Sequence, residues 1–381
     1  MALIPSQRHL FDIPDDIAYF NCAYQGPQLK ASTEALIQGV HSKSTPWTCK
    51  PIDFFEAPEN FRHLMGKVTG APASNFAICP SASYGMTLAA RSIEPSLKPG
   101  DEILMIAETF PSTYLTWKRT ADETGAVTAM VDAPDDHDWT RAILERISPA
   151  TRVLSLPHIH WGTGAMIDVE AIADAAHENG IWLVFDLTQS IFAIPFDFDR
   201  IKPDFVAIAG YKWALFPYGL STTYVDPKWH SARPIEETWM NREGAHIFEK
   251  LAQYSDQYQL GARRFDMGEK SLPTLIPGGI AALKQISEWG VSNIQDTLRH
   301  LTSRIAEFVT DVGLTPVPET CRSPNILGAS STNGLPEGLL PALAAQNIYI
   351  SQRGNSLRFA PYLHSSDADM TRLEAALRSA F

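Results

Sequence analysis

The chain has 381 residues, 45% of them hydrophobic and 19% charged, which is typical of a globular protein with one large domain and a smaller one. Its net charge of -12 argues against a nucleic-acid or anionic-membrane surface, since both favour basic patches. The four cysteines show no CxxC or zinc-like spacing, so neither a disulfide framework nor a metal site is expected: Cys22, Cys49, Cys79 and Cys321.

The first 44 residues predict an arm, a short strand and a helix. Residues 1–16 lack a basic segment followed by an apolar core, and no apolar run in the chain approaches the ~20 residues of a membrane span, so we expect an unprocessed cytoplasmic protein. The stretch 18–27, AYFNCAYQGP, predicts a strand that runs into a Gly-Pro turn. Helical patterns follow over 30–44 and 59–69.

The stretch 75–93, NFAICPSASYGMTLAARSI, predicts a strand, a turn of small residues and a helix. Ser81, Ala82 and Ser83 form the turn. The unpaired N–H groups and partial positive charge of a helix N-terminus suit a phosphate. Serine is also the usual helix N-cap, so a purely structural role is the alternative.

The loop 157–164, PHIHWGTG, follows a predicted strand over 152–156 and precedes a helix. It contains two histidines, His158 and His160. A histidine in such a loop suits either a general base or a structural hydrogen bond.

The chain is organised around residues 181–220. Two short apolar runs, 181–186 and 204–209, are bounded by Pro and Gly and predict buried parallel strands. Asp186 ends the first run, and Lys212 follows the second. Both side chains should point into one crevice, because open α/β folds bind ligands at the carboxyl edge of the sheet. Pyridoxal phosphate (PLP) chemistry needs this pair: a lysine amine to hold the aldehyde as a Schiff base, and an anion to keep the pyridine nitrogen protonated.

With Gln189 three residues beyond Asp186, this pattern resembles the fold type I PLP enzymes of the aminotransferase class V family. That family includes cysteine desulfurases, kynureninase and isopenicillin N epimerase-like proteins. The resemblance implies a three-layer αβα sandwich with a mostly parallel seven-stranded sheet and a small α+β C-terminal domain. The large domain would span 17–277, and the small one 1–16 with 278–381. It also implies a homodimer.

The resemblance implies several contacts with the cofactor. Lys212 would carry PLP and act as general base at the substrate α-carbon, Asp186 would pair with the pyridine nitrogen, and Gln189 would donate to the ring oxygen. Phe110 would stack on the ring, with an ordinary core position as the alternative. Further contacts would come from the phosphate turn and the loop 157–164: Ser81, Ala82, Ser83, His160 and Thr163.

Three positions depart from the family pattern. Trp161 stands where the family has an Asn that reaches the ring hydroxyl, so His158 or His160 would have to substitute. Tyr211 stands where the family often has a phosphate-binding His or Ser. Glu269 replaces a Thr that reaches the phosphate of the partner subunit; we expect it to point elsewhere and an arginine to neutralise the phosphate: Arg263 or Arg264.

The resemblance also implies substrate contacts. Arg358, in the C-terminal stretch SLRFAPYL, would pair with a substrate carboxylate, and Arg353 is a second candidate. Asn21 fills a family turn on the substrate side. The alternatives are that the arginines lie at the surface and that Asn21 only satisfies backbone groups of its turn.

The reaction is narrowed by a missing thiol. Desulfurases that resemble this chain carry a nucleophilic Cys between the equivalents of Arg353 and Arg358, where this chain has only GNSL. The missing thiol argues against persulfide chemistry. Among the reactions that remain we expect an aminotransferase acting on an amino acid, because that is the most frequent activity, with a C–S or Cβ lyase or an epimerase as the alternative. A further possibility is an inactive class V domain that serves as a binding module. The retained Lys212 and Asp186 argue against it, because a scaffold has no need for a buried amine opposite a buried carboxylate.

Overall fold

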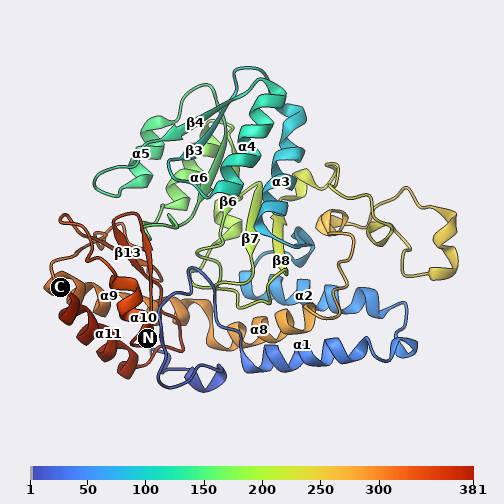
Figure 1. The fold of residues 1–381 in the computed structure, drawn as a ribbon. Coiled ribbons are helices and arrows are strands. Elements are labelled where there is room, and N and C mark those ends of the chain that lie inside the picture. The colour runs from blue at the N-terminus through green and yellow to red at the C-terminus, as the bar shows by residue number, and fades with distance from the viewer. Residues whose placement is uncertain (1–2) are drawn as a thin grey trace.

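The computed structural model describes residues 3–381 and is built around a seven-stranded sheet (Figure 1). The strands in spatial order are β2 (Phe76–Cys79), β8 (Ser221–Val225), β7 (Phe205–Ala209), β6 (Trp182–Asp186), β5 (Thr151–Pro157), β3 (Glu102–Ile106) and β4 (Val127–Val131). The pairs from β7 to β4 are parallel, whereas β8 runs antiparallel to both β7 and β2. This confirms the mostly parallel sheet, in which the strand after Lys212 runs in the opposite direction.

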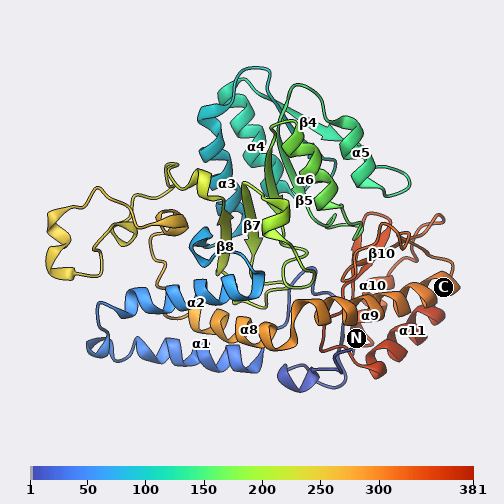
Figure 2. The same ribbon diagram turned by 180° about the vertical axis from the view of Figure 1, so that it is seen from behind.

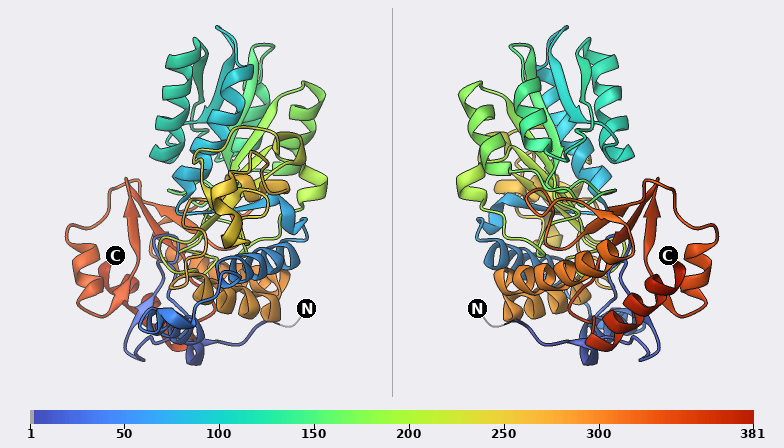
Figure 3. Two further views of the ribbon diagram at one scale, coloured as in Figure 1. Left: turned by 90° about the vertical axis from the view of Figure 1, so that its right-hand side faces the viewer. Right: turned by 90° about the vertical axis from the view of Figure 1, so that its left-hand side faces the viewer.

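Helices cover both faces of this sheet (Figure 3). Alternate side chains of a strand point to opposite faces, so Ile103 packs in one core with Trp117 of α4 (Pro111–Thr124), while Leu104 packs in the other with Ile172 of α6 (Val169–Glu178). The same two cores hold α3 (Ala82–Ile93) on the first face, and α5 (Trp139–Arg146) and α7 (Phe198–Ile201) on the second. The predicted three-layer αβα fold is confirmed.

Three long helices pack together below the sheet in Figure 1. They are α1 (Lys30–Ser42), α2 (Asp53–Thr69) and α8 (Ile276–Trp289), and α8 contacts both of the others. The expectation that the second helix begins at Glu59 is wrong, since it begins at Asp53. Proline is unfavourable inside a helix, and Pro58 lies inside α2. The first turn, which precedes Pro58, is packed against the rest of the protein by Phe54, whose ring centre lies 5.8 Å from that of Phe248.

The C-terminal part forms a smaller α+β unit, seen from behind in Figure 2. Helix α9 (Val291–Asp311) leads into an antiparallel sheet of order β12 (Ser351–Arg353), β13 (Ser356–Phe359), β10 (Leu327–Ser330) and β9 (Thr315–Pro316), with α10 (Leu339–Ala344) and α11 (Asp367–Ala380). The N-terminal β1 (Ala18–Tyr19) joins this unit by pairing with β11 (Ile348–Tyr349). The exact division into domains stays a prediction.

An arm, residues 227–268, extends away from the sheet and is coloured yellow in Figure 1. Its regular structure is limited to short 3-10 helices: η5 (Pro227–Trp229), η6 (Trp239–Asn241), η7 (Phe248–Gln253) and η8 (Gly261–Phe265). Other such turns are η1 (Arg8–Leu10), η2 (Pro46–Thr48), η3 (Ala73–Asn75) and η4 (Glu94–Ser96). Within residues 3–381, every helix is too short or too polar to cross a membrane.

Candidate active site

A cavity of about 260 Å³, here called the inner cavity, lies at the carboxyl edge of the parallel strands. Asp186 ends β6 and Lys212 follows β7, and these two strands pair in parallel. Both side chains line the inner cavity. The structure therefore brings together the acid and the amine whose meeting the sequence predicted.

Asp186 is a partly buried acid at the end of β6. Burial raises the pKa of its carboxyl group, while hydrogen bonds from Thr188 and the charge of Lys212 work in the other direction. The backbone N–H of Thr188 donates to Asp186 Oδ1 at 2.9 Å, and the Thr188 hydroxyl accepts from Ala209 N at 3.0 Å. Thr188 thus fixes the end of β6 against the end of β7, a role that sequence reasoning missed.

Lys212 is 7% exposed, and its Nζ lies 5.6 Å from the ring centre of Tyr211 and 5.9 Å from that of Phe110. Burial lowers the pKa of the amine to about 8; Asp186 opposes this shift, and two nearby arginines add to it. A substantial share of the amine is therefore neutral near physiological pH, which a nucleophilic lysine requires.

The turn before α1 supports the lysine loop. Gly26 N donates to the Tyr211 carbonyl at 3.0 Å, and a Cβ on Gly26 would lie 2.1 Å from the Lys212 carbonyl oxygen. Only glycine allows the two backbones to come this close. The sequence showed the Gly-Pro turn but not that it packs on Lys212, so this contact was missed.

Gln189 lines the inner cavity with its amide held on two sides. Its Oε1 accepts from Trp213 Nε1 at 3.0 Å, and its Nε2 donates to the Ala23 carbonyl at 3.0 Å. These bonds fix which end of the amide carries the donors. Nε2 keeps a second hydrogen, so donation to a cofactor oxygen stays a prediction.

The predicted phosphate turn forms another wall of the inner cavity. Ser81 caps α3 by accepting from Tyr84 N at 3.2 Å, and its hydroxyl lies 2.9 Å from that of Ser83. Ala82 is the first residue of the helix. Two hydroxyls and the free N–H groups of a 12-residue helix therefore meet beside Asp186 and Lys212.

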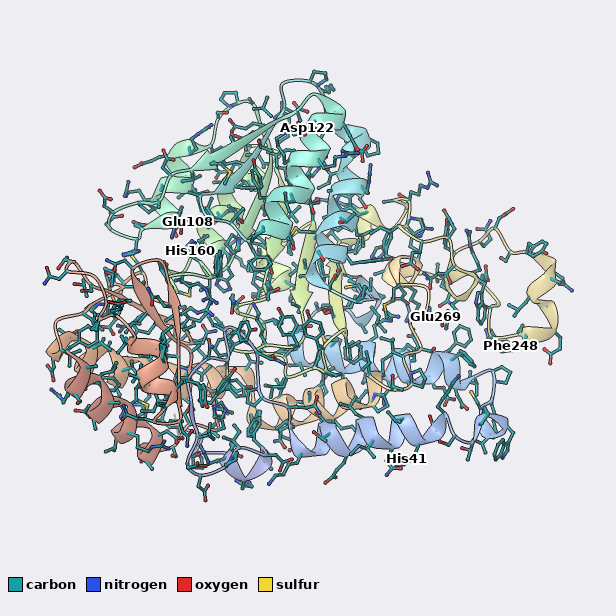
Figure 4. The ribbon with its side chains drawn as sticks, in the orientation of Figure 1. His41, Glu108, Asp122, His160, Phe248 and Glu269 are labelled. Atoms are coloured by element: carbon teal, nitrogen blue, oxygen red, sulfur yellow. The ribbon has the colours of Figure 1, made fainter. Side chains whose placement is uncertain are left out.

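The loop 157–164 alternates its side chains, and only one set faces the inner cavity: Pro157, Ile159 and Trp161. His160 points the other way, where its Nδ1 lies 2.9 Å from the Thr163 hydroxyl and its ring stacks on Trp139 at 5.4 Å. Figure 4 shows His160 beside Glu108, with His160 Nε2 and Glu108 Oε2 3.8 Å apart. Burial lowers the pKa of His160 to about 4.

This alternation corrects the expected cofactor contacts of His160 and Thr163, which the structure does not bring to the cavity. His158 does not reach the cavity either, because it is buried against Phe196, with 6.0 Å between the ring centres. An extended loop turns successive side chains to opposite sides, and Trp161 occupies the side that faces the cavity. Counting by two along the loop would have found this.

A second hollow of about 270 Å³, the outer hollow, adjoins the inner cavity. The residues that line both are Phe110, Trp161, Gln189, Tyr211, Lys212 and Tyr218. Arg358 of β13 lines this hollow and is 1% exposed. Its Nη1 donates to the Trp161 carbonyl at 2.6 Å and its Nε to the Ser351 hydroxyl at 3.1 Å. Within residues 3–381 its Nη2 has no hydrogen-bond partner.

Among the described residues, the guanidinium of Arg358 donates to a hydroxyl and a carbonyl and to no carboxylate. Burial lowers its pKa to about 9, and the charge of Arg353 adds to that shift. An uncompensated buried cation is costly unless an anion binds to it. The alternative of a surface position is therefore wrong for Arg358.

Arg353 also lines the outer hollow, with its guanidinium 5.5 Å from the ring centre of Trp161 and Nη1 donating to the Gln352 carbonyl at 2.7 Å. Asn21 lies outside both linings, and its carbonyl accepts from the N–H groups of Tyr24 and Gln25. The buried side-chain Oδ1 of Asn21 has no hydrogen-bond partner within residues 3–381, so both its turn role and its substrate contact stay predictions.

Phe110 lines both the inner cavity and the outer hollow and is 44% exposed. It precedes α4, and its ring meets that of Trp161 edge to face, 6.0 Å between centres. An ordinary core position, the alternative for Phe110, is therefore wrong. Stacking on a cofactor ring stays a prediction.

The cysteines, Glu269 and Arg263 all lie apart from the inner cavity and the outer hollow. Within residues 3–381, none of the four cysteines lines the inner cavity or the outer hollow. Glu269 is exposed and lies toward the arm in Figure 4. Arg263 is engaged by Glu59 through two hydrogen bonds of 2.6 and 2.9 Å, so it is not free to neutralise a phosphate.

The arrangement fits PLP. The helix N-terminus with two serine hydroxyls suits a phosphate, Asp186 lacks a full positive partner and suits a protonated pyridine nitrogen, and Lys212 suits an aldehyde. These groups line one cavity. Within residues 3–381, no group of three metal-ligating side chains is present.

The chain is similar to several known proteins. The "uncharacterized aminotransferase YcbU" of Bacillus subtilis is 26% identical, over 86% of this chain and 84% of that protein. The isopenicillin N epimerase of Amycolatopsis lactamdurans is 22% identical, over 83% of each chain. The cysteine desulfurase of Haloferax volcanii is 32% identical, over 68% of this chain and 58% of that protein.

Solved structures of low sequence identity share the fold. A C-DES variant with glycine covalently linked to its PLP cofactor matches with a TM-score of 0.88 and 17% identity, over 98% of this chain and all of that one. The cysteine desulfurase CsdA of Escherichia coli matches with a TM-score of 0.83 and 18% identity, over 98% and 97%. The family model of aminotransferase class-V matches residues 50–374. The chain therefore belongs to the aminotransferase class-V family of PLP-dependent enzymes.

Proposed function

We propose that this protein is a PLP-dependent enzyme that acts on an amino acid, and that its reaction is transamination. The observation that carries the proposal is the meeting of Lys212, with a pKa lowered to about 8, and Asp186, with a raised pKa, in one cavity at adjoining strand ends. A structural lysine has no reason to be buried beside the N-terminus of a helix that suits phosphate.

Each end of the site has a proposed task. Lys212 would hold the cofactor aldehyde, Asp186 the pyridine nitrogen, and Ser81 and Ser83 the phosphate. Arg358 would hold the substrate carboxylate with its unpartnered Nη2, which fixes the α-carbon in the outer hollow near Lys212.

When bound, PLP supplies an electron sink for the charge that develops on the substrate α-carbon. Lys212 Nζ would then accept the α-proton and return it at a different carbon. Among the described residues that line the inner cavity, Lys212 provides the single amine. Burial raises the pKa of the neighbouring Tyr211, which makes that phenol a poor second base.

A single amine that moves one proton supports transamination, because an epimerase that works through two bases needs a second one on the opposite face. The name of the Bacillus subtilis relative, an aminotransferase, also supports this choice. The absence of a thiol from the linings within residues 3–381 argues against transfer of sulfur to the protein.

The test is to incubate the PLP-loaded protein with single L-amino acids and no keto acid, and to extract the cofactor after denaturation. Transamination should convert the cofactor to pyridoxamine phosphate and release one keto acid per site. Failure of every amino donor to do so would overturn the proposal.

The second candidate is a lyase that cleaves a C–S or Cβ bond. It is favoured by the solved complex of the cystine C–S lyase C-DES with cysteine persulfide, which matches with a TM-score of 0.85, 17% identity and coverage of 95% of this chain and 97% of that one. In the same incubation a C–S lyase would release a sulfur-containing fragment together with ammonia and a keto acid, and a Cβ–Cγ lyase would release a shortened amino acid together with the side-chain fragment. Both would leave the cofactor as PLP. An epimerase would only change the optical rotation of the amino acid, and a binding module would change nothing.

We also propose that two copies of the chain associate. Large apolar side chains are exposed on the arm and near α1, including Leu260 at 86% and Trp47 at 79%. Where such residues gather into a contiguous patch, that patch marks a protein–protein contact. Light scattering should give twice the chain mass.

The four free cysteines suit a reducing compartment, and a cytoplasmic location stays a prediction.

A further inference from the structure

Several aromatic rings line the outer hollow. Tyr24, Trp161, Tyr211 and Tyr218, here called the aromatic wall, all belong to its lining, and the last three also line the inner cavity. Tyr24 is 61% exposed and Tyr218 is 74% exposed. The rings of Tyr211 and Tyr218 lie 4.8 Å apart, centre to centre. Exposed aromatic rings gathered around a cavity indicate a surface that binds something apolar.

Within the aromatic wall, Trp161 is itself held in place by hydrogen bonds. Its indole N–H donates to the Glu108 carbonyl at 2.7 Å, and its own carbonyl accepts from Arg358 Nη1 at 2.6 Å. One residue therefore connects the wall to the guanidinium that lacks an anion. A ring that is already fixed loses little further freedom when a ligand packs on it.

The charges of the outer hollow limit what packs there. Lys212, Arg353 and Arg358 line it, and within residues 3–381 its lining contains no carboxylate. A cationic side chain would be repelled by the net positive charge of this lining. Arg353 needs an anionic partner less than Arg358 does, because its guanidinium already lies 5.5 Å from the Trp161 ring centre and donates to the Gln352 carbonyl at 2.7 Å. Arg358 is left as the group that most needs a carboxylate.

The position of the substrate side chain follows from the tetrahedral geometry of the α-carbon. If its carboxylate is on Arg358 and its amino group is beside Lys212, its side chain has to occupy the rest of the outer hollow. Lys212 Nζ is 5.6 Å from the Tyr211 ring centre, so that side chain comes within reach of the aromatic wall.

We propose that the amino substrate has a large, flat, apolar side chain, such as that of an aromatic amino acid, which packs on the aromatic wall. This inference rests on the proposed function, because it takes Arg358 and Lys212 as the contacts of the carboxylate and the amino group.

The test measures binding of L-amino acids to the PLP-loaded protein by the change in absorbance of the cofactor and, separately, by quenching of tryptophan fluorescence. L-phenylalanine and L-tryptophan should bind about 10-fold or more tightly than L-alanine, because burial of a large apolar side chain adds that much affinity. L-lysine should bind most weakly. Equal or tighter binding of L-alanine or L-glutamate would overturn the inference while leaving the proposed function intact.

Variants locate the effect. Tyr218→Ala should reduce the ratio of phenylalanine to alanine affinity about 3-fold or more, and Tyr218→Phe should keep it. Tyr254→Ala is the matched control, since Tyr254 is equally exposed but lies on the arm, outside the outer hollow. An unchanged ratio in Tyr218→Ala would overturn the role of the wall. If no amino acid of any kind changes either signal, the proposed function fails together with the inference.

Discussion

The two ends of the active site balance their charges differently. At the inner cavity an acid and an amine, Asp186 and Lys212, face a shared space from neighbouring strands. At the outer hollow Arg353 and Arg358 stand without an acid in the lining within residues 3–381. The inner end is thus nearly complete for holding a cofactor with a cationic ring nitrogen, whereas the outer end is complete only when an anion arrives. The inner end therefore suits a cofactor that stays bound, and the outer end suits a substrate that binds and leaves.

The most severe way to break this comparison is Lys212→Ala. PLP should no longer become covalently attached, because no other amine lines the inner cavity within residues 3–381. Borohydride reduction followed by intact-mass measurement should show the cofactor fixed to the wild type and absent from the variant. Lys118→Ala, an exposed lysine on α4, is the matched control and should keep full labelling. Continued labelling of the Lys212 variant would identify another anchor, with the buried Lys270 as the first to test.

Arg358→Lys breaks the outer end alone. An ammonium keeps the charge but loses the planar fork, so the KM for the amino substrate should rise about 10-fold or more, from loss of roughly 1.5–3 kcal/mol of charge-assisted hydrogen bonding. Cofactor labelling should stay at the wild-type level, in contrast to Lys212→Ala. Arg372→Lys on α11, outside both linings, serves as the control. If the variant lost affinity for the cofactor and not for the substrate, the two ends would not have separate functions.

The inner end was also the part that the sequence predicted best. Strand ends, helix caps and turns are local features, so Asp186 and Lys212 could be placed at one sheet edge from short apolar runs. The position of Ser81 and Ser83 beside them and the mostly parallel sheet were implied by the family resemblance. Sequence reasoning failed at α2, whose first turn depends on a contact between Phe54 and the distant arm.

The outer end depends on contacts between distant segments. Arg358 finds its place through the Trp161 carbonyl, 197 residues earlier in the chain. Gly26 closes on the Lys212 loop from near the N-terminus. No periodicity in the sequence reports such contacts. His160 was misplaced for a different reason, because the motif identified the loop but not the side to which each residue turns.

The pH dependence of cofactor attachment sharpens the comparison further. Only the neutral amine attacks an aldehyde, and the pKa of Lys212 is lowered to about 8, so attachment to the apoprotein should speed up as pH rises and level off above 8. Between pH 8 and pH 7 the rate should fall about 5-fold, as expected for one group of that pKa. Stopped-flow absorbance after mixing with PLP gives the rate. A midpoint near the ordinary lysine value of about 10.4 would show that burial does not tune this amine.

The smallest expected effect separates two neighbouring hydroxyls of the inner end. Ser83→Ala should weaken PLP binding about 2- to 10-fold, the worth of one hydrogen bond to the phosphate, and should leave the stability of the apoprotein unchanged. Ser81→Ala should weaken PLP binding similarly but also lower the free energy of unfolding by about 1 kcal/mol, because Ser81 caps α3 through Tyr84 N. Equilibrium dialysis gives the first quantity, and urea denaturation of the apoprotein gives the second. If both variants lost stability and neither lost affinity, the turn would be only a helix cap, and the phosphate would have to bind elsewhere in the cavity.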